Sequence, residues 1–263
     1  MFNFWLIKNY IKYKLFSRHK YGHGIHSPFV FDFIVNVLNK KVTNNDFKDI
    51  EILRKELKSN KSLINVTDLG AGSKKSKSNY RKIKDIAKYS VESRKNAELI
   101  YKICDYYNCK NVLELGTSLG ITSCYIAMSN KKSINLTTIE GCKNIASIAQ
   151  DNFNKLSVDN IKLIVNNFDY ELNNQVKNNN FDLIYFDGNH KYKATIFYFN
   201  TALKYSKSNS IFIFDDIYWS PEMTKAWNEI KSNDKVKVSI DLFNLGIIFF
   251  KDGLSKQDFV IRY

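Results

Sequence analysis

Acidic residues stand at the ends of two apolar runs in the second half of the chain. Asp187 closes "FDLIYFD", Asp215 and Asp216 close "SIFIFDD", and His190 follows Asp187 by three residues. Grouped carboxylates can bind a hard cation such as Mg²⁺, and a histidine can accept a proton near neutral pH. These residues could therefore bind a cation or take up a proton. The alternative is that the acids only cap the helices that follow them.

Two glycine-bearing stretches, "VTDLGAGSKKSK" and "VLELGTSLGITS", could each let the main chain approach a nucleotide-type cofactor. Only the second is followed by an acid at the end of the next apolar run, Glu140, which lies 24 residues after Gly116. An acid at that position accepts hydrogen bonds from ribose hydroxyls. "ELGTSLG" is therefore the predicted cofactor loop, although a glycine loop alone can be a tight strand-to-helix turn. The spacing differs from the GxGxxG of nicotinamide enzymes, and "DLGAGS" is interpreted as an edge loop or flap.

A sheet must bring these residues together, and the second half of the chain predicts one. Five β-rich runs alternate with helical stretches: "NVLEL", "INLTTIE", "IKLIV", "FDLIYFD" and "SIFIFDD". This alternation predicts an α/β fold with a parallel, doubly wound sheet, whose strands end at one common edge. "VKVSIDLF", the turn "NLG" and "IIFFK" then predict an antiparallel hairpin.

The first 90 residues predict a helical leader and cap, and residues 91–263 the α/β domain. The apolar residues of the first predicted helix share roughly one face: Phe4, Trp5, Ile7, Ile11 and Phe16. Ser27 and Pro28 predict an N-cap and first turn, and further helices are predicted over 47–57 and 91–107. Between the first two helices, "YGHGIHSP" carries His23 and His26, whose spacing favours a structural loop over a metal site.

The net charge of +14 would suit nucleic acid or an anionic membrane surface. However, 35 of the 40 basic residues are Lys, only five are Arg, and Asn occurs 31 times. Because phosphate and base recognition favour Arg, we interpret the excess as compositional drift. No apolar run is long enough to span a membrane, and the N-terminal segment does not resemble a signal peptide. The four cysteines lack the spacing of a metal site or a disulfide framework. A cytoplasmic location is expected.

Four stretches, in their order and spacing, resemble class I S-adenosylmethionine-dependent methyltransferases of the catechol O-methyltransferase-like branch. They are "VLELGTSLGITS", "TTIEG", "FDLIYFDGNHKY" and "IFIFDDIYW". The resemblance covers roughly residues 91–251 and implies a Rossmann-like sheet of seven strands, the seventh antiparallel. "HGIHSPFVFDF" also resembles the leader of an uncharacterised bacterial subgroup of such enzymes.

The resemblance implies a role for each matching position. Glu114 and the loop residues Gly116, Thr117, Ser118 and Gly120 would contact the methionine moiety and the sulfonium. Glu140 would hold the ribose. Phe168 and Asp169, after the third strand, would lie near adenine, with core packing as the alternative for Phe168.

The resemblance also implies a divalent metal, and this chain departs from the family's pattern at two of these positions. Asp187, Asp215 and Asp216 correspond to the ligands, but the last of these is usually Asn. The usual base, a Lys three residues after the first ligand, is replaced by His190. A Mg²⁺ site and a metal-free acid and histidine site both stay open.

The predicted function is O-methylation of a small hydroxylated acceptor, with S-adenosylmethionine as cofactor. The leader and residues 73–90 are expected to shape the acceptor pocket, and the N-terminal helix could form a homodimer. An RNA methyltransferase that uses the basic surface and a non-catalytic cofactor-binding module are the alternatives. The chain has only Pro28 and Pro221, so the Pro-Pro motif of methyltransferases acting on amide or amino nitrogens is excluded.

Overall fold

The computed structural model describes residues 4–43, 46–67 and 79–263, so the "DLGAGS" loop and the basic segment after it lie outside the described residues. The chain forms two compact units. One combines Met1–Lys40 with Leu172–Tyr263, and the other is Lys41–Glu171. The division predicted from the sequence, at residue 90, stays a prediction.

The unit Lys41–Glu171 is built on three parallel strands in the order β3-β4-β5. These strands are β3 (Asn111–Leu115), β4 (Asn135–Glu140) and β5 (Ile161–Val165). Helices α6 (Ile121–Ala127) and α7 (Lys143–Lys155) make the two crossovers, and a short 3-10 turn, η2 (Ser129–Lys132), follows α6. All three strands were predicted from their β-branched and apolar residues, and their pairing is confirmed as parallel.

Helices and a small hairpin complete this unit. The helices are α3 (Lys48–Ser59), α4 (Ile83–Tyr89) and α5 (Arg94–Tyr106). Strands β1 (Leu63–Asn65) and β2 (Tyr80–Lys82) pair antiparallel, a hairpin that the sequence did not predict. The core of this unit is a cluster of buried apolar side chains that includes Phe47, Leu119, Tyr125 and Phe153. The loop after β3 therefore rests on a packed base.

The other unit carries five strands in the order β10-β8-β9-β7-β6. They are β6 (Leu183–Phe186), β7 (Ile211–Phe214), β8 (Val238–Asp241), β9 (Gly246–Phe249) and β10 (Gln257–Val260). Strands β6 and β7 are parallel, and β8 and β9 form the predicted antiparallel hairpin. Helices α9 (Tyr192–Leu203) and α10 (Pro221–Ser232) connect them, and α8 (Phe168–Asn178) precedes β6. The larger sheet has eight strands where seven were expected, because β10 adds to β8.

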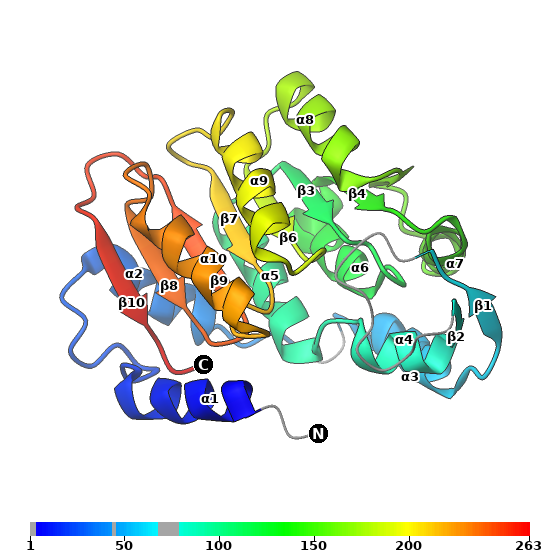
Figure 1. Ribbon diagram of the computed structural model, residues 1–263, viewed down its shortest axis with the longest axis horizontal. Coiled ribbons are helices and arrows are strands. Elements are labelled where there is room, and N and C mark those ends of the chain that lie inside the picture. Colours follow the sequence, from blue (N-terminus) through cyan, green and yellow to red (C-terminus); the bar gives the residue numbers. More distant parts are fainter. Residues whose placement is uncertain (1–3, 44–45, 68–78) are drawn as a thin grey trace. The chain divides into compact units, whose positions relative to one another are not determined.

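The N-terminal residues belong to the same unit as the C-terminus (Figure 1). Helix α1 (Phe4–Phe16) leads to α2 (Pro28–Phe33), which continues into the π-helical turn η1 (Ile34–Leu38). The predicted cap is confirmed, since the Ser27 hydroxyl accepts from the Val30 N–H. Arg18 forms a parallel bridge with Ile261, so the segment after α1 borders the end of β10.

None of the helices in the described part of the chain has the length and apolarity that a membrane crossing requires. The expected cytoplasmic location stays a prediction. In the "YGHGIHSP" loop, His23 and His26 are exposed, and the Arg18 side chain donates to the Gly24 carbonyl at 2.6 Å. The loop is thus held by a side chain that donates to its main chain, as is common in a structural turn.

Candidate active site

The predicted cofactor loop leaves β3 through a left-handed main chain. Gly116, Ser118 and Gly120 have φ values of 109°, 50° and 78°. The Gly116 N–H donates to the Ile139 carbonyl at 3.0 Å, so the loop begins beside the end of β4. Glycine adopts such angles without cost, which explains the two glycines at the ends of the loop.

Gly120 is also required by close packing. It is the N-cap of α6, and a Cβ placed on it would lie 2.5 Å from Cε1 of Phe153 and 3.3 Å from Cβ of Ala149. The main chain therefore runs against α7 without room for a side chain. Asn152, also on α7, donates to the Leu119 carbonyl at 2.9 Å and fixes the loop from the same side.

Glu140 ends β4 and points toward the loop. Its Oε2 accepts the Ser118 N–H at 3.0 Å, and its Oε1 accepts the Cys142 N–H at 2.9 Å. An ionised carboxylate accepts several hydrogen bonds, so a side chain held in this way is of the type that binds ribose hydroxyls. The structure thus brings together Glu140 and Ser118, two of the predicted cofactor-binding residues, and their contact with a cofactor stays a prediction.

Glu114, in the middle of the predicted motif, is fully buried. Its Oε2 accepts from the Ser123 hydroxyl and, at 2.6 Å, from the Thr138 hydroxyl. Burial raises the pKa of Glu114 to about 7, the two hydroxyls counteract this in part, and the charge of Glu140 adds to it. The carboxyl is thus poised between its protonated and ionised forms near neutral pH.

Two buried oxygen atoms at this loop have no hydrogen-bond partner among the described residues. They are Oε1 of Glu114 and Oγ of Ser118. A buried polar atom without a partner is costly, so such atoms call for a ligand or an ordered water. Thr117, by contrast, is satisfied, because its hydroxyl lies 2.6 Å from the Thr138 hydroxyl. The carboxyl groups of Glu114 and Glu140 and the loop of residues 116–120 fit a polar cofactor with a cationic centre. The two unpaired oxygen atoms fit it as well.

The two residues expected to lie near adenine, Phe168 and Asp169, follow β5. The Asn166 N–H donates to the Glu140 carbonyl at 3.1 Å, which places the end of β5 beside the end of β4. Phe168, at the start of α8, is half-buried, and Asp169 is exposed, with its N–H bound to the Asn167 side chain at 2.9 Å. Their contact with adenine stays a prediction.

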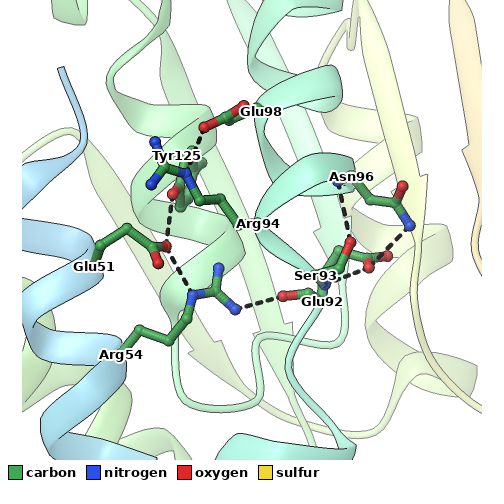
Figure 2. A network of polar contacts seen from close by, with 8 residues as sticks. All are labelled: Glu51, Arg54, Glu92, Ser93, Arg94, Asn96, Glu98 and Tyr125. Carbon is green, nitrogen blue, oxygen red and sulfur yellow. Dashed lines mark hydrogen bonds and ion pairs between the residues drawn. The ribbon is translucent and has the colours of Figure 1, made fainter. Parts of the chain in front are cut away.

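A buried polar network anchors α6, the helix that begins at the loop (Figure 2). The Tyr125 hydroxyl donates to Oε1 of Glu51 at 2.7 Å, and Arg54 donates to the same oxygen at 2.8 Å. Arg54 also donates to the Glu92 carbonyl at 2.6 Å. Burial and the bond to Glu51 raise the pKa of Tyr125, so its hydroxyl stays protonated and donating. The sequence did not reveal this network, because Glu51 and Arg54 lie on α3, more than fifty positions before α6.

The acids of the other unit follow two neighbouring parallel strands. The Asp215 N–H donates to the Phe186 carbonyl at 3.0 Å, so Asp187 and Asp215 leave β6 and β7 side by side. Asp187 and His190 form a pair, with Oδ1 and Nε2 3.8 Å apart and both side chains largely buried. Asp216 has a φ of 54°, a strained angle for an aspartate.

None of these acids caps the helix that follows. Lys191 is the N-cap of α9, and Ser220 is the N-cap of α10, where its hydroxyl accepts from the Met223 N–H. The capping interpretation is therefore wrong. Within residues 4–43, 46–67 and 79–263, no group of three or more His, Cys, Asp or Glu side chains lies close enough to hold a metal ion. The three aspartates do not form a preassembled metal site, and their role as ligands stays a prediction.

Asn189 is a further residue of this loop that sequence analysis did not single out. It has a φ of 52°, its Nδ2 donates to the Tyr198 hydroxyl at 3.2 Å, and its buried Oδ1 has no partner among the described residues. The signal was present in "DGNH", because Asn after Gly favours a left-handed turn.

A parallel sheet with a glycine loop after one strand, and an acid ending the next strand, is the arrangement of Rossmann-like folds. Residues 113–217 match the family model described as a methyltransferase domain. This match confirms the resemblance found in the sequence over these residues. No curated protein matches the sequence.

Solved structures share this fold. The SAH-bound methyltransferase PaMTH1 of Podospora anserina is 15% identical, with 86% of this chain and 97% of that chain covered and a TM-score of 0.60. The O-methyltransferase of Bacillus cereus in complex with SAH is 16% identical, with 84% and 97% covered and a TM-score of 0.53. The O-methyltransferase TomG of Streptomyces achromogenes, in complex with SAM, is 17% identical, with 62% and 82% covered and a TM-score of 0.54.

Proposed function

We propose that the chain is an S-adenosylmethionine-dependent O-methyltransferase that acts on a small hydroxylated acceptor. The observation that carries the proposal is the loop of residues 116–120, held by Glu140 through the Ser118 N–H at 3.0 Å. Support comes from the methyltransferase domain at residues 113–217 and from structural neighbours named as O-methyltransferases. Two of the neighbours contain SAH and one contains SAM.

The residues of the unit Lys41–Glu171 would bind the cofactor. Glu140 would accept hydrogen bonds from the ribose hydroxyls. Glu114 offers a buried, partnerless oxygen whose charge would favour a cationic cofactor over a neutral one. The cofactor, when bound, supplies an activated methyl group on a sulfonium. The fixed loop contributes by orienting it before the reaction, which lowers the entropic part of the barrier.

His190 is the proposed base that removes the proton of the acceptor hydroxyl. In O-methylation the acceptor oxygen forms a bond to the methyl carbon while the carbon–sulfur bond breaks, and the hydroxyl proton must leave. His190 can take that proton, and Asp187, 3.8 Å from Nε2, would stabilise the resulting imidazolium. The step needs no further reactant. The sulfur loses its positive charge when the carbon–sulfur bond breaks, and the imidazole gains one when it takes the proton.

The residues present do not assemble a metal site, so no step of this proposal passes through a metal ion. A metal-dependent version of the reaction would require Asp187, Asp215 and Asp216 to converge on one point. Activity that survives EDTA would support the histidine version, and activity that EDTA abolishes and Mg²⁺ restores would support the metal version.

Calorimetric titration with S-adenosylmethionine and S-adenosylhomocysteine tests the cofactor assignment. The unchanged protein should bind both, and Glu140→Ala should weaken binding by roughly 10- to 100-fold, the effect of losing hydrogen bonds to a charged group. Asp159→Ala is the charge-matched control, because Asp159 is an exposed acid in the same unit, and it should change affinity less than twofold. Absence of heat with either compound would refute the proposal.

A further inference from the structure

Helix α1 is fixed to its unit by one face. Tyr13 is only 4% exposed, and its hydroxyl donates to the Ile261 carbonyl at 2.6 Å and accepts the Tyr263 N–H at 2.8 Å. The Tyr10 and Phe243 rings meet edge to face with centroids 5.1 Å apart. Arg262 donates to the Lys14 carbonyl at 2.6 Å. The orientation of the helix about its axis is therefore determined.

The face opposite Tyr13 is apolar and exposed. Phe4, Ile7, Ile11 and Leu15 are 80%, 41%, 54% and 72% exposed. Their spacing of three, four and four residues places them in one stripe, because each residue turns the helix by about 100°. We call these four residues the outer apolar face. A contiguous exposed apolar surface of this kind marks an interaction site more often than a scattered exposed residue does.

Lysines border the outer apolar face on both sides. By the same helical geometry, Lys8 and Lys12 lie along one side and Lys14 along the other. Residues 1–31 contain these three lysines, Arg18 and Lys20, and no Asp or Glu. We interpret the number of lysines in the chain as compositional drift. It does not account for apolar side chains that point outward between them.

We propose that α1 lies in the plane of an anionic lipid surface, with the outer apolar face inserted at the level of the headgroups. An exposed apolar stripe between lysines is the pattern of interfacial helices, and each lysine adds attraction to anionic lipids. A second copy of the chain would also cover the apolar stripe. Its lysines would then face the lysines of the first copy and repel them, in a protein of net charge +14. The charge thus favours the lipid surface as the occupant. The proposal does not depend on the methyltransferase assignment.

Flotation of the full chain with lipid vesicles tests the proposal. Vesicles of phosphatidylcholine with one quarter phosphatidylglycerol should carry the protein upward, and vesicles of phosphatidylcholine alone should carry at least tenfold less. Ile7→Ser with Ile11→Ser should lower binding to the anionic vesicles at least tenfold. Replacing Lys8, Lys12 and Lys14 by Gln should lower it on the order of 100-fold, at roughly 1 kcal/mol for each lysine.

Matched controls separate this effect from loss of folding. Ile52→Ser removes an apolar side chain that is 45% exposed on α3, and it should leave vesicle binding within twofold of the original. Circular dichroism should show the same helix content for all variants, because the substituted side chains are exposed. Equal binding to neutral and anionic vesicles, or binding to neither, would overturn the proposal. A dimer in solution that Ile7→Ser with Ile11→Ser dissociates would also overturn it, in favour of an interface between copies.

Discussion

The main-chain N–H of Ser118 donates to Oε2 of Glu140 at 3.0 Å. This bond joins the loop after β3 to the last residue of β4, and the second oxygen of the same carboxylate accepts the Cys142 N–H at 2.9 Å. A carboxylate held from two sides cannot turn away without leaving two amides unpaired. The proposed ribose acceptor is therefore oriented before the cofactor binds, which reduces the entropy lost on binding.

The glycine at the start of α6 should tolerate no side chain. Gly120→Ala adds a Cβ 2.5 Å from the Phe153 ring at a φ of 78°. We expect about 1 kcal/mol from the left-handed main chain and roughly 1–3 kcal/mol more from overpacking, as a loss of unfolding free energy in urea. Gly253→Ala is the matched control, because Gly253 has a φ of 79° and nothing within 4 Å of the added Cβ. Equal losses for the two variants would contradict the packing argument.

Glu114 should make the stability of the protein depend on pH. Burial raises its pKa from 4.5 to about 7 in the folded state, so the folded chain holds this proton more tightly than the unfolded chain. Stability should consequently fall as pH rises from about 4.5 to about 7 and level off above, by roughly 3 kcal/mol in all. Glu114→Gln is neutral throughout and should remove this fall.

Urea denaturation at several values between pH 5 and pH 8 measures the difference between the two proteins. Glu56→Gln serves as control, since the Glu56 side chain is 49% exposed and its loss should leave the pH dependence unchanged. If the curves of the original protein and Glu114→Gln run parallel, the carboxyl does not titrate in this range and the prediction is wrong.

The network of Figure 2 should stabilise the base of the loop. Tyr125→Phe removes the buried hydroxyl that donates to Glu51 at 2.7 Å, and should lower the free energy of unfolding by about 1–3 kcal/mol. Tyr170→Phe makes the same chemical change at a side chain that is 76% exposed, and should cost less than about 0.5 kcal/mol. Thermal unfolding of the two variants compares them directly.

The proposed base can be tested once a preparation shows transfer of a labelled methyl group. His190→Asn should lower kcat by roughly 10²- to 10⁴-fold and leave the affinity for S-adenosylhomocysteine within twofold. His19→Asn, at an exposed histidine of the loop after α1, should leave kcat unchanged. Removal of metal ions with EDTA should also leave kcat unchanged. A full rate in His190→Asn would eliminate this residue as the base.

Much of the fold follows from local sequence signals. The strands at 111–115, 135–140, 161–165, 183–186 and 211–214 were predictable because short β-rich runs are bounded by polar turns and separated by helical stretches. The eighth strand was not. In β10, Phe259 is the one residue below 9% exposed, and the strand pairs with β8 partly through a bond from Ser239 to Asp258 at 2.5 Å. Contacts between distant residues leave no local pattern.

Part of the candidate site could likewise be predicted from the sequence, and part could not. Gly116, Gly120 and Glu140 were predictable because a left-handed turn and a strand-end acid require particular residue types. The burial of Glu114 and the support from Glu51 and Arg54 arise from tertiary packing, which spacing does not encode. In α1, the apolar period located the helix but did not indicate that Tyr13 packs inward while Phe4 and Ile11 point outward.

A crystal structure of the protein grown with S-adenosylhomocysteine tests the central claim most directly. The account predicts both ribose hydroxyls within hydrogen-bonding distance of the Glu140 carboxylate, and the homocysteine portion along residues 116–120, with the Ser118 hydroxyl or Glu114 no longer unpaired. Density for the compound elsewhere, or a Glu140 side chain turned away from the ribose, would contradict it.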